Sequence, residues 1–275
     1  MSSIRATAIL GLHLIVPGAA GLAQQPVLPA RSFERPEASP RVHGLVGRLL
    51  SARRGDSRFG QEHEGEVVVG ENFPLVTLKG GQRPIVLGFG SQVYGRFSLS
   101  DSKSALISTD WVVGLNTTAV LNRVTLTLEV FHESSHLGDE YGDRFPGDRI
   151  DWTREVLAGW ASYLAGPWRF TMGSSYVLVD ELRLPAAAGS FGVDFRGKSR
   201  QFLGGSVRPV AGLFTEAGAA TRWRFSTSAK LGLAFGTGEN HDVSLGLIAH
   251  DGLSTQRQFF RQESRYIGME LRFDL

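Results

Sequence analysis

Side chains able to carry out acid–base or nucleophilic chemistry gather in one short stretch near the middle of the chain. His132 and Ser134 stand two residues apart, and a further group follows: Ser135, His136, Asp139 and Glu140. A histidine within reach of a serine hydroxyl can take its proton as general base and make the oxygen nucleophilic. His132 and Ser134 are therefore the candidate catalytic pair, and the other four residues form a candidate binding or structural cluster.

The residues before this stretch predict a β-strand that delivers the cluster at its tip. Apolar and polar residues alternate strictly from 124 to 130, which is the period of a strand with one apolar and one polar face. If the alternation continues, His132, Ser134 and His136 share the apolar face. Residues two apart on a strand lie about 6.6 Å apart, so the His132 imidazole can reach the Ser134 hydroxyl.

The letters HESSH, residues 132–136, also match the H-E-x-x-H zinc pattern. That pattern binds zinc on a helix, whereas two histidines four apart on a strand are separated by about 13 Å. No zinc site or other cofactor is expected, although His136, Asp139 and Glu140 leave a looser divalent-metal site as an alternative. The interpretation we favour at this point is structural: the cluster ties a long loop to the rim of the fold by hydrogen bonds.

The same alternation recurs along the chain and predicts an all-β transmembrane antiparallel barrel of the outer-membrane type. A soluble β-sandwich also alternates, but it would not account for an apolar leader, an amphipathic final strand and inward charges together. About twelve strands are expected, with ten as the alternative, near residues 41–51, 66–79, 84–99, 105–119, 122–134, 151–165, 167–180, 187–197, 202–217, 221–236, 240–251 and 259–275.

The ends and the composition set the predicted organisation. Residues 1–23 have a basic start, a short apolar run and small residues before Gln24, as in a secretory signal peptide. Residues 24–41 are expected to form a flexible Pro-rich periplasmic segment, and 42–275 the barrel. The chain of 275 residues has no cysteine, which excludes disulfides and a lipoprotein anchor, and its formal charge of +2 does not favour nucleic acid. We expect export to the cell outer membrane and contact with its lipids.

The connections predict a direction for the barrel. Short ones, such as KGGQ and GTGEN, alternate with longer ones, of which residues 52–65 and 135–150 are the longest. If the short connections are periplasmic, the His/Ser cluster lies at the extracellular rim. Charged residues are expected to face inward and to fill the modest lumen of a dozen strands: Arg96, Glu129, Arg224, Lys230, Glu270 and Arg272.

Two local patterns resemble known outer-membrane proteins. The alternating last strand resembles the carboxy-terminal signal of bacterial barrels, which implies recognition by the barrel-assembly machinery, although the final residue is Leu275 instead of Phe. The triplet His132-Glu133-Ser134 resembles the His-x-Ser pair of the outer-membrane phospholipase A and lipid A deacylase, which implies a serine-type lipid acyl hydrolase. In those enzymes Asn follows the Ser and an orienting residue comes about a dozen positions later, where this chain has Ser135 and Pro146. Asp148, Asp151 or Glu155 could replace the orienting residue if the long loop is arranged differently.

Several longer sequence segments are similar to a bacterial family known only as domain of unknown function 1207. The matching segments are FHESSHLGDEY, STDWVVGL, DRIDWTREVLAGWASY, VRPVAGLF and HDGLSTQRQFF. The resemblance implies an outer-membrane barrel and no particular activity. Three functions therefore stay open: a structural or surface-interaction barrel, which is favoured, a lipid hydrolase that uses Ser134 and His132, and a pore for small solutes.

Overall fold

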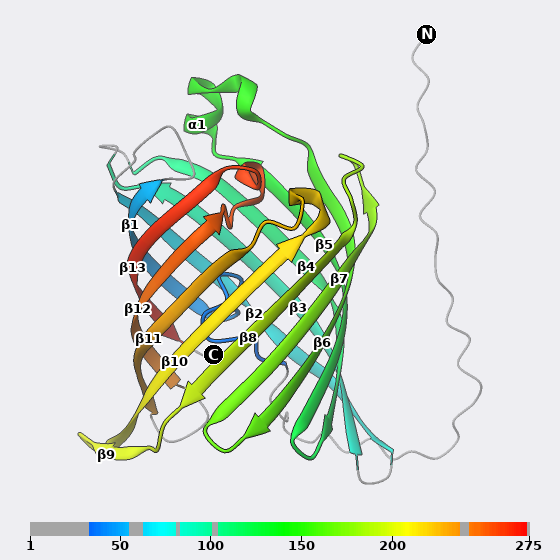
Figure 1. Ribbon diagram of the computed structural model, residues 1–275, viewed down its shortest axis with the longest axis vertical. Helices are drawn as coiled ribbons and strands as arrows, with labels where there is room; N and C mark the ends of the chain where they lie inside the picture. The colour runs from blue at the N-terminus through cyan, green and yellow to red at the C-terminus, as the bar shows by residue number, and fades with distance from the viewer. Residues whose placement is uncertain (1–32, 55–62, 81–82, 101–103, 237–241, 274–275) are drawn as a thin grey trace.

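Twelve long antiparallel strands form a single sheet that closes on itself as a barrel (Figure 1). The computed structural model describes residues 33–54, 63–80, 83–100, 104–236 and 242–273. The long strands are β1 (Leu45–Arg54), β2 (His63–Gly80), β3 (Arg83–Ser98), β4 (Leu106–Leu121), β5 (Val124–Leu137), β6 (Trp152–Ala165), β7 (Trp168–Asp180), β8 (Ala187–Arg196), β10 (Gly205–Gly218), β11 (Ser226–Gly236), β12 (Asp242–Leu253) and β13 (Glu263–Phe273).

The barrel closes because the first strand pairs with the last. β1 lies between β2 and β13, with Leu45 opposite Phe273 and Leu50 opposite Gly268. Every other long strand pairs with its sequence neighbours, except that β8 pairs with β10, because the three-residue β9 (Arg200–Phe202) only extends the turn between them. The twelve-stranded barrel predicted from the sequence is thus confirmed, whereas β9 was not predicted.

The two ends of the barrel differ. One end, named here the helical end, carries α1 (Asp139–Arg144) and the short 3-10 helices η1 (Pro146–Asp148), η2 (Ala219–Thr221) and η3 (Arg257–Phe259). The other end, the hairpin end, carries β9 and tight turns such as the one at Gly166 (Figure 1). Within the described residues, no helix is long and apolar enough to cross a membrane.

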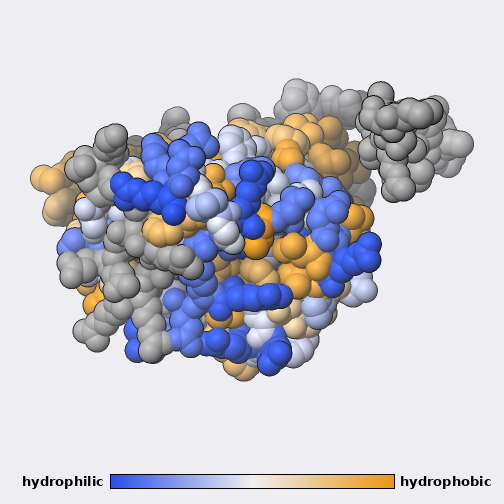
Figure 2. All heavy atoms as spheres, turned by 90° about the horizontal axis from the view of Figure 1, so that it is seen from above, coloured by the Kyte–Doolittle hydropathy of each residue, from blue (hydrophilic) through white to orange (hydrophobic). Residues whose placement is uncertain are grey.

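The outer wall is apolar and the inner wall is polar, as the alternation predicts. On β13, Ile267, Met269 and Leu271 are 56%, 50% and 40% exposed, whereas the intervening Glu270 and Arg272 are buried. Seen from above, hydrophilic residues gather over the end of the molecule and hydrophobic residues show along parts of its outline (Figure 2). An apolar belt with a polar interior is stable only where acyl chains, not water, surround the wall.

Buried ion pairs fill much of the interior. Arg96 is fully buried and donates to Glu64 at 2.8 Å and to Glu66 at 2.7 Å. Arg48 pairs with Glu66 and with Glu270, which links neighbouring strands across the β1–β13 junction. Five of the six charged residues expected to face inward are buried, but the expectation for Arg224 was wrong. Arg224 precedes β11, is half-exposed, and pairs with Glu263 at the helical end. The alternation was extended too far, because β11 begins only at Ser226.

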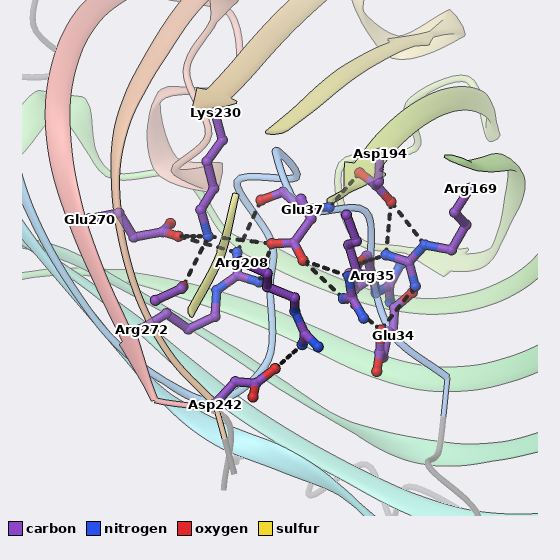
Figure 3. A network of polar contacts seen from close by, with 12 residues as sticks. Glu34, Arg35, Glu37, Arg169, Asp194, Arg208, Lys230, Asp242, Glu270 and Arg272 are labelled. Atoms are coloured by element: carbon purple, nitrogen blue, oxygen red, sulfur yellow. Dashed lines mark hydrogen bonds and ion pairs between the residues drawn. The ribbon is translucent and has the colours of Figure 1, made fainter. Parts of the chain in front are cut away.

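Residues 33–43, named here the lumen segment, run inside the barrel before the chain enters β1 (Figure 1). Glu37 lies at its centre and pairs with three cations from different strands: Arg196 at 2.9 Å, Lys230 at 3.3 Å and Arg272 at 3.4 Å (Figure 3). Its backbone N–H donates to Asp194 at 2.8 Å. The wall and the segment therefore have complementary charges.

Further contacts fix both halves of the lumen segment. Arg35 pairs with Glu129 at 2.8 Å, and Arg41 pairs with Asp110 at 2.7 Å. Two wall glycines allow the close approach: a Cβ at Gly192 would meet Pro36 at 2.8 Å, and one at Gly212 would meet the Ala38 nitrogen at 2.9 Å. Each glycine thus leaves the space that the segment occupies.

The position of the lumen segment differs from the flexible periplasmic segment expected over residues 24–41. The described part of the expected segment, residues 33–41, is largely buried inside the barrel. The barrel wall begins at Leu45 instead of residue 42. Mixed charge and proline are typical of a linker in water, but here the charges have buried partners. The expected signal peptide, residues 1–23, lies outside the described residues.

Candidate active site

Strand β5 places the candidate catalytic pair on the membrane-facing side, near the helical end. Leu126, Leu128 and Val130 are exposed on this face, and His132 and Ser134 continue it toward the end of the strand. The alternating Thr127, Glu129, Glu133 and Ser135 are buried in the interior. The face predicted for His132 and Ser134 agrees with the structure.

A carboxylate on the next strand holds the His132 ring. Glu155 of β6 lies directly opposite His132 in the β5–β6 register, and its Oε1 is 2.8 Å from His132 Nδ1. Both side chains are partly exposed, at 38% and 45%. A carboxylate that accepts from Nδ1–H selects the tautomer in which Nε2 is free to accept a proton.

Ser134 is the nearest hydroxyl on the same face of the same strand. It is half-buried and faces Trp111 of β4 on one side and Thr153 of β6 on the other. Among the described residues, no side-chain hydrogen bond joins Ser134 to His132. Such catalytic contacts are often long before substrate binds, and the spacing of two residues keeps the hydroxyl within reach.

The remaining predicted residues do not form one cluster. Ser135 points inward, where its hydroxyl donates to Asp110 and its carbonyl accepts from Gln258 Nε2 at 2.7 Å. His136 is exposed on the outer face, and Asp139 and Glu140 are exposed in the first turn of α1. Strand parity separates Ser135 from its neighbours, and the described part of the chain contains no group of three side chains able to hold a metal ion.

The loop after β5 is anchored mainly by an aromatic residue that the sequence analysis did not single out. Tyr141 of α1 is fully buried against Ile107 and Phe259, and its hydroxyl donates to Asp148 at 2.8 Å. Gly138 N–H donates to the Ile107 carbonyl at 2.9 Å and turns the chain into the helix. The sequence around Tyr141 is otherwise polar, so it gives no sign that the Tyr141 side chain is buried. Only the fold shows this contact.

The glutamate of HESSH lies on the other side of the wall. Glu133 is buried, accepts from Trp152 Nε1 at 3.0 Å, and pairs with Arg257 at 2.9 Å and with Arg41 at 3.3 Å. It therefore joins the lumen segment and the η3 connection to β5. Because β5 continues as a strand through Leu137, His132 and His136 are not on adjacent turns of a helix, which the zinc pattern requires.

The closed barrel, its apolar belt and its polar interior define the class of protein, an outer-membrane β-barrel. The chain belongs to the family described as "Protein of unknown function (DUF1207)", whose model matches residues 22–275. This confirms the resemblance seen in the sequence. No curated protein matches the chain.

Solved structures with the same fold include outer-membrane phospholipases. The enzyme from Salmonella typhi, a dimer with bound calcium, has a TM-score of 0.58 at 12% identity over 87% of this chain and 92% of its own. The Escherichia coli outer-membrane phospholipase A has a TM-score of 0.59 at 13% identity over 90% of this chain and 94% of its own. At this identity the likeness concerns the fold alone.

Proposed function

We propose that the protein hydrolyses acyl esters of membrane lipids, with Ser134 as nucleophile, His132 as general base and Glu155 as the residue that positions His132. The observation that carries the proposal is the 2.8 Å contact between His132 Nδ1 and Glu155 Oε1 on the membrane-facing wall. A triad needs a third group to orient the base. Of the three acidic residues considered from the sequence, only Glu155 has this contact among the described residues; Asp148 instead accepts from Tyr141.

The reaction follows from the order of these groups. His132 Nε2 takes the Ser134 proton as Ser134 Oγ bonds to the ester carbonyl carbon, and the proton then passes to the departing alcohol oxygen. The resulting acyl-Ser134 is cleaved by water, whose proton His132 accepts and returns to Ser134 Oγ. Glu155 stays ionised throughout and stabilises the imidazolium that forms in each step.

The surroundings of the pair favour a lipid substrate. Val113 lies opposite His132 and Trp111 opposite Ser134, and both are exposed to the membrane, at 41% and 51%. An ester near the helical end can reach Ser134 while its acyl chain lies along the apolar face that continues to Leu128. We assign the helical end to the outside of the cell because its connections are the longer ones, as in bacterial barrels. The substrate would then come from the outer leaflet.

The proposal is tested by release of fatty acid from phospholipid or lipid A by the full chain in detergent or vesicles. Ser134→Ala is expected to reduce release to background, and Glu155→Gln to reduce kcat by up to roughly 10⁴-fold, as loss of an orienting carboxylate does elsewhere. Ser91→Ala is the matched control, because Ser91 also faces outward, on β3, and no histidine lies beside it in the register. Lipid turnover that is unchanged in Ser134→Ala would refute the enzyme.

A structural or surface-interaction barrel is the second candidate. The observation that favours it is the rim loop held in one position by buried Tyr141. A folded protein without lipid turnover, whose surface binding is lost when the 138–150 connection is replaced, would support this candidate. A solute pore has less support, because the lumen segment and its ion pairs occupy the interior.

Export through a signal peptide and insertion by the barrel-assembly machinery complete the proposal. β13 supplies an amphipathic last strand, with apolar residues outward and Glu270 and Arg272 inward. Deletion of residues 1–23 should leave the chain in the cytoplasm. Replacing Phe273 by Asp should reduce recovery from the outer membrane without affecting synthesis.

A further inference from the structure

A cavity of about 170 Å³ lies inside the barrel at the helical end, apart from the His132–Ser134 pair on the outer wall. It is bounded by the upper parts of β6, β7, β8 and β10 and by the η3 connection. Part of its lining is apolar, as at Val156 and Ala188. Five charged side chains also line it: Glu133, Arg154, Glu216, Arg224 and Arg257. Three of them bear on ligand binding, namely Glu216, Arg154 and Arg257, whereas Glu133 and Arg224 are engaged in ion pairs with Arg257 and Glu263.

These three side chains have hydrogen-bonding capacity that the described residues do not use. Arg257 donates from its backbone N–H to Asp110 and from its Nε to Glu133, so its terminal nitrogens are left for the cavity that it lines. The Nε of Arg154 is buried and has no described partner. The Glu216 side chain has no hydrogen bond or ion pair among the described residues.

Positive and negative groups thus face the same small space. Burial alone would lower the pKa of the Arg257 guanidinium, but Glu133, Glu216 and Asp110 raise it above its ordinary value. Glu216 and Arg257 line the same cavity, yet among the described residues no ion pair joins them. Glu216 is partly shielded from solvent and Arg257 is only 27% exposed, so a molecule that bonds to both groups would stabilise the arrangement.

The size and lining of the cavity limit the classes of ligand that can bind in it. A cavity of roughly 150 Å³ holds one benzene molecule, so this one fits a molecule of similar size. Sugar sites usually offer an open aromatic face, whereas Trp152 is buried here between Arg154 and Phe260. The remaining complementary ligand bears an anion for Arg257 and an ammonium for Glu216.

We propose that this cavity binds a small zwitterion, a molecule that carries a carboxylate or phosphate together with an ammonium group. A free amino acid of the size of alanine or serine fits this description, and so does phosphoethanolamine, whether free or as the headgroup of a lipid. The anion bonds to the terminal nitrogens of Arg257, the ammonium bonds to Glu216, and a short side chain lies against Val156 and Ala188. The proposal is independent of the lipid hydrolase, because its residues lie inside the wall.

The test is calorimetric titration of the full chain in detergent micelles with L-alanine, N-acetyl-L-alanine, ethylamine and O-phosphoethanolamine. At least one zwitterion is expected to bind ten-fold or more tightly than N-acetyl-L-alanine and ethylamine, each of which lacks one of the two charges. Binding of L-alanine indicates a free amino acid as the ligand, whereas binding of O-phosphoethanolamine alone indicates phosphoethanolamine; added phosphatidylethanolamine that competes with it then identifies a headgroup, and the lack of competition identifies the free compound.

Glu216→Gln should weaken zwitterion binding at least ten-fold and remove the preference over N-acetyl-L-alanine. It should not lower the stability of the barrel, because Glu216 has no described partner to lose. Asp251→Asn is the control, since Asp251 is exposed at the same end and its one ion pair within the described ranges is with exposed Arg265, at 2.7 Å. Equal binding of the zwitterions and their singly charged analogues, or unchanged binding in Glu216→Gln, would overturn the proposal.

Discussion

Glu37→Gln tests whether the lumen segment is held in place by charge. The substitution keeps the size of the side chain but removes its charge from contacts with Arg196, Lys230 and Arg272. Breaking one side of a buried ion pair costs about 3–5 kcal/mol when the remaining charge loses its only partner. Here Lys230 and Arg272 keep Glu270, at 2.8 and 3.2 Å, so the cost falls to about 2–3 kcal/mol.

Hydrogen exchange of backbone amides measures this loss directly. A loss of about 2–3 kcal/mol in the free energy that holds the segment should speed exchange of its protected amides by roughly 30–150-fold. Exchange in β3, β4 and β5 should stay unchanged, because the barrel wall does not open when the segment leaves its site.

Glu34→Gln is the matched control within the same segment. Glu34 also pairs with Arg196, at 2.8 Å, but its side chain is 31% exposed and solvent screens the contact. Its effect should stay below about 1 kcal/mol, or about five-fold in exchange. Similar acceleration in both variants, or none in Glu37→Gln, would show that packing and not charge retains the segment.

Three further substitutions test the wall and the interior. Leu128→Arg places a charge on the membrane-facing side and should cost about 2–4 kcal/mol in urea unfolding from lipid vesicles, with Leu128→Ala as the control; equal costs would place Leu128 away from acyl chains. Arg96→Met removes the guanidinium shared by Glu64 and Glu66 and should cost about 3–5 kcal/mol in the same measurement, whereas a neutral effect would mean that water replaces it. Gly212→Val fills the space of the lumen segment and should expose the segment to added protease, while an unchanged cleavage pattern would contradict the close contact.

Most of the wall could be predicted because each strand carries its own signal. The alternation located all twelve long strands, since lipid outside and ion pairs inside impose opposite requirements on successive residues. The face of His132 and Ser134 followed from the same parity. Arg224 was misplaced because alternation alone does not show where a strand ends and a connection begins.

The missed features depend on contacts between distant parts of the chain. The lumen segment resembles a linker until the partners of Glu37 are known, and those partners lie about 160 to 235 residues later. Glu155 could be named as a candidate but not chosen, because the choice depends on the β5–β6 register. Tyr141 likewise becomes an anchor only when Phe259 packs against it.

The junction of β1 with β13 sets an order of events during assembly. Leu45 and Phe273 are among the most distant residues in the chain, so their pairing has to wait until nearly all of the polypeptide is present. The segment before β1 is attached to one border of that junction and lies on its concave side. Glu37 of this segment bonds to β8, β11 and β13, so its ion pairs can form only after the last strand has been made. The charges at the centre of the barrel are therefore neutralised late in assembly, when the circumference is being completed.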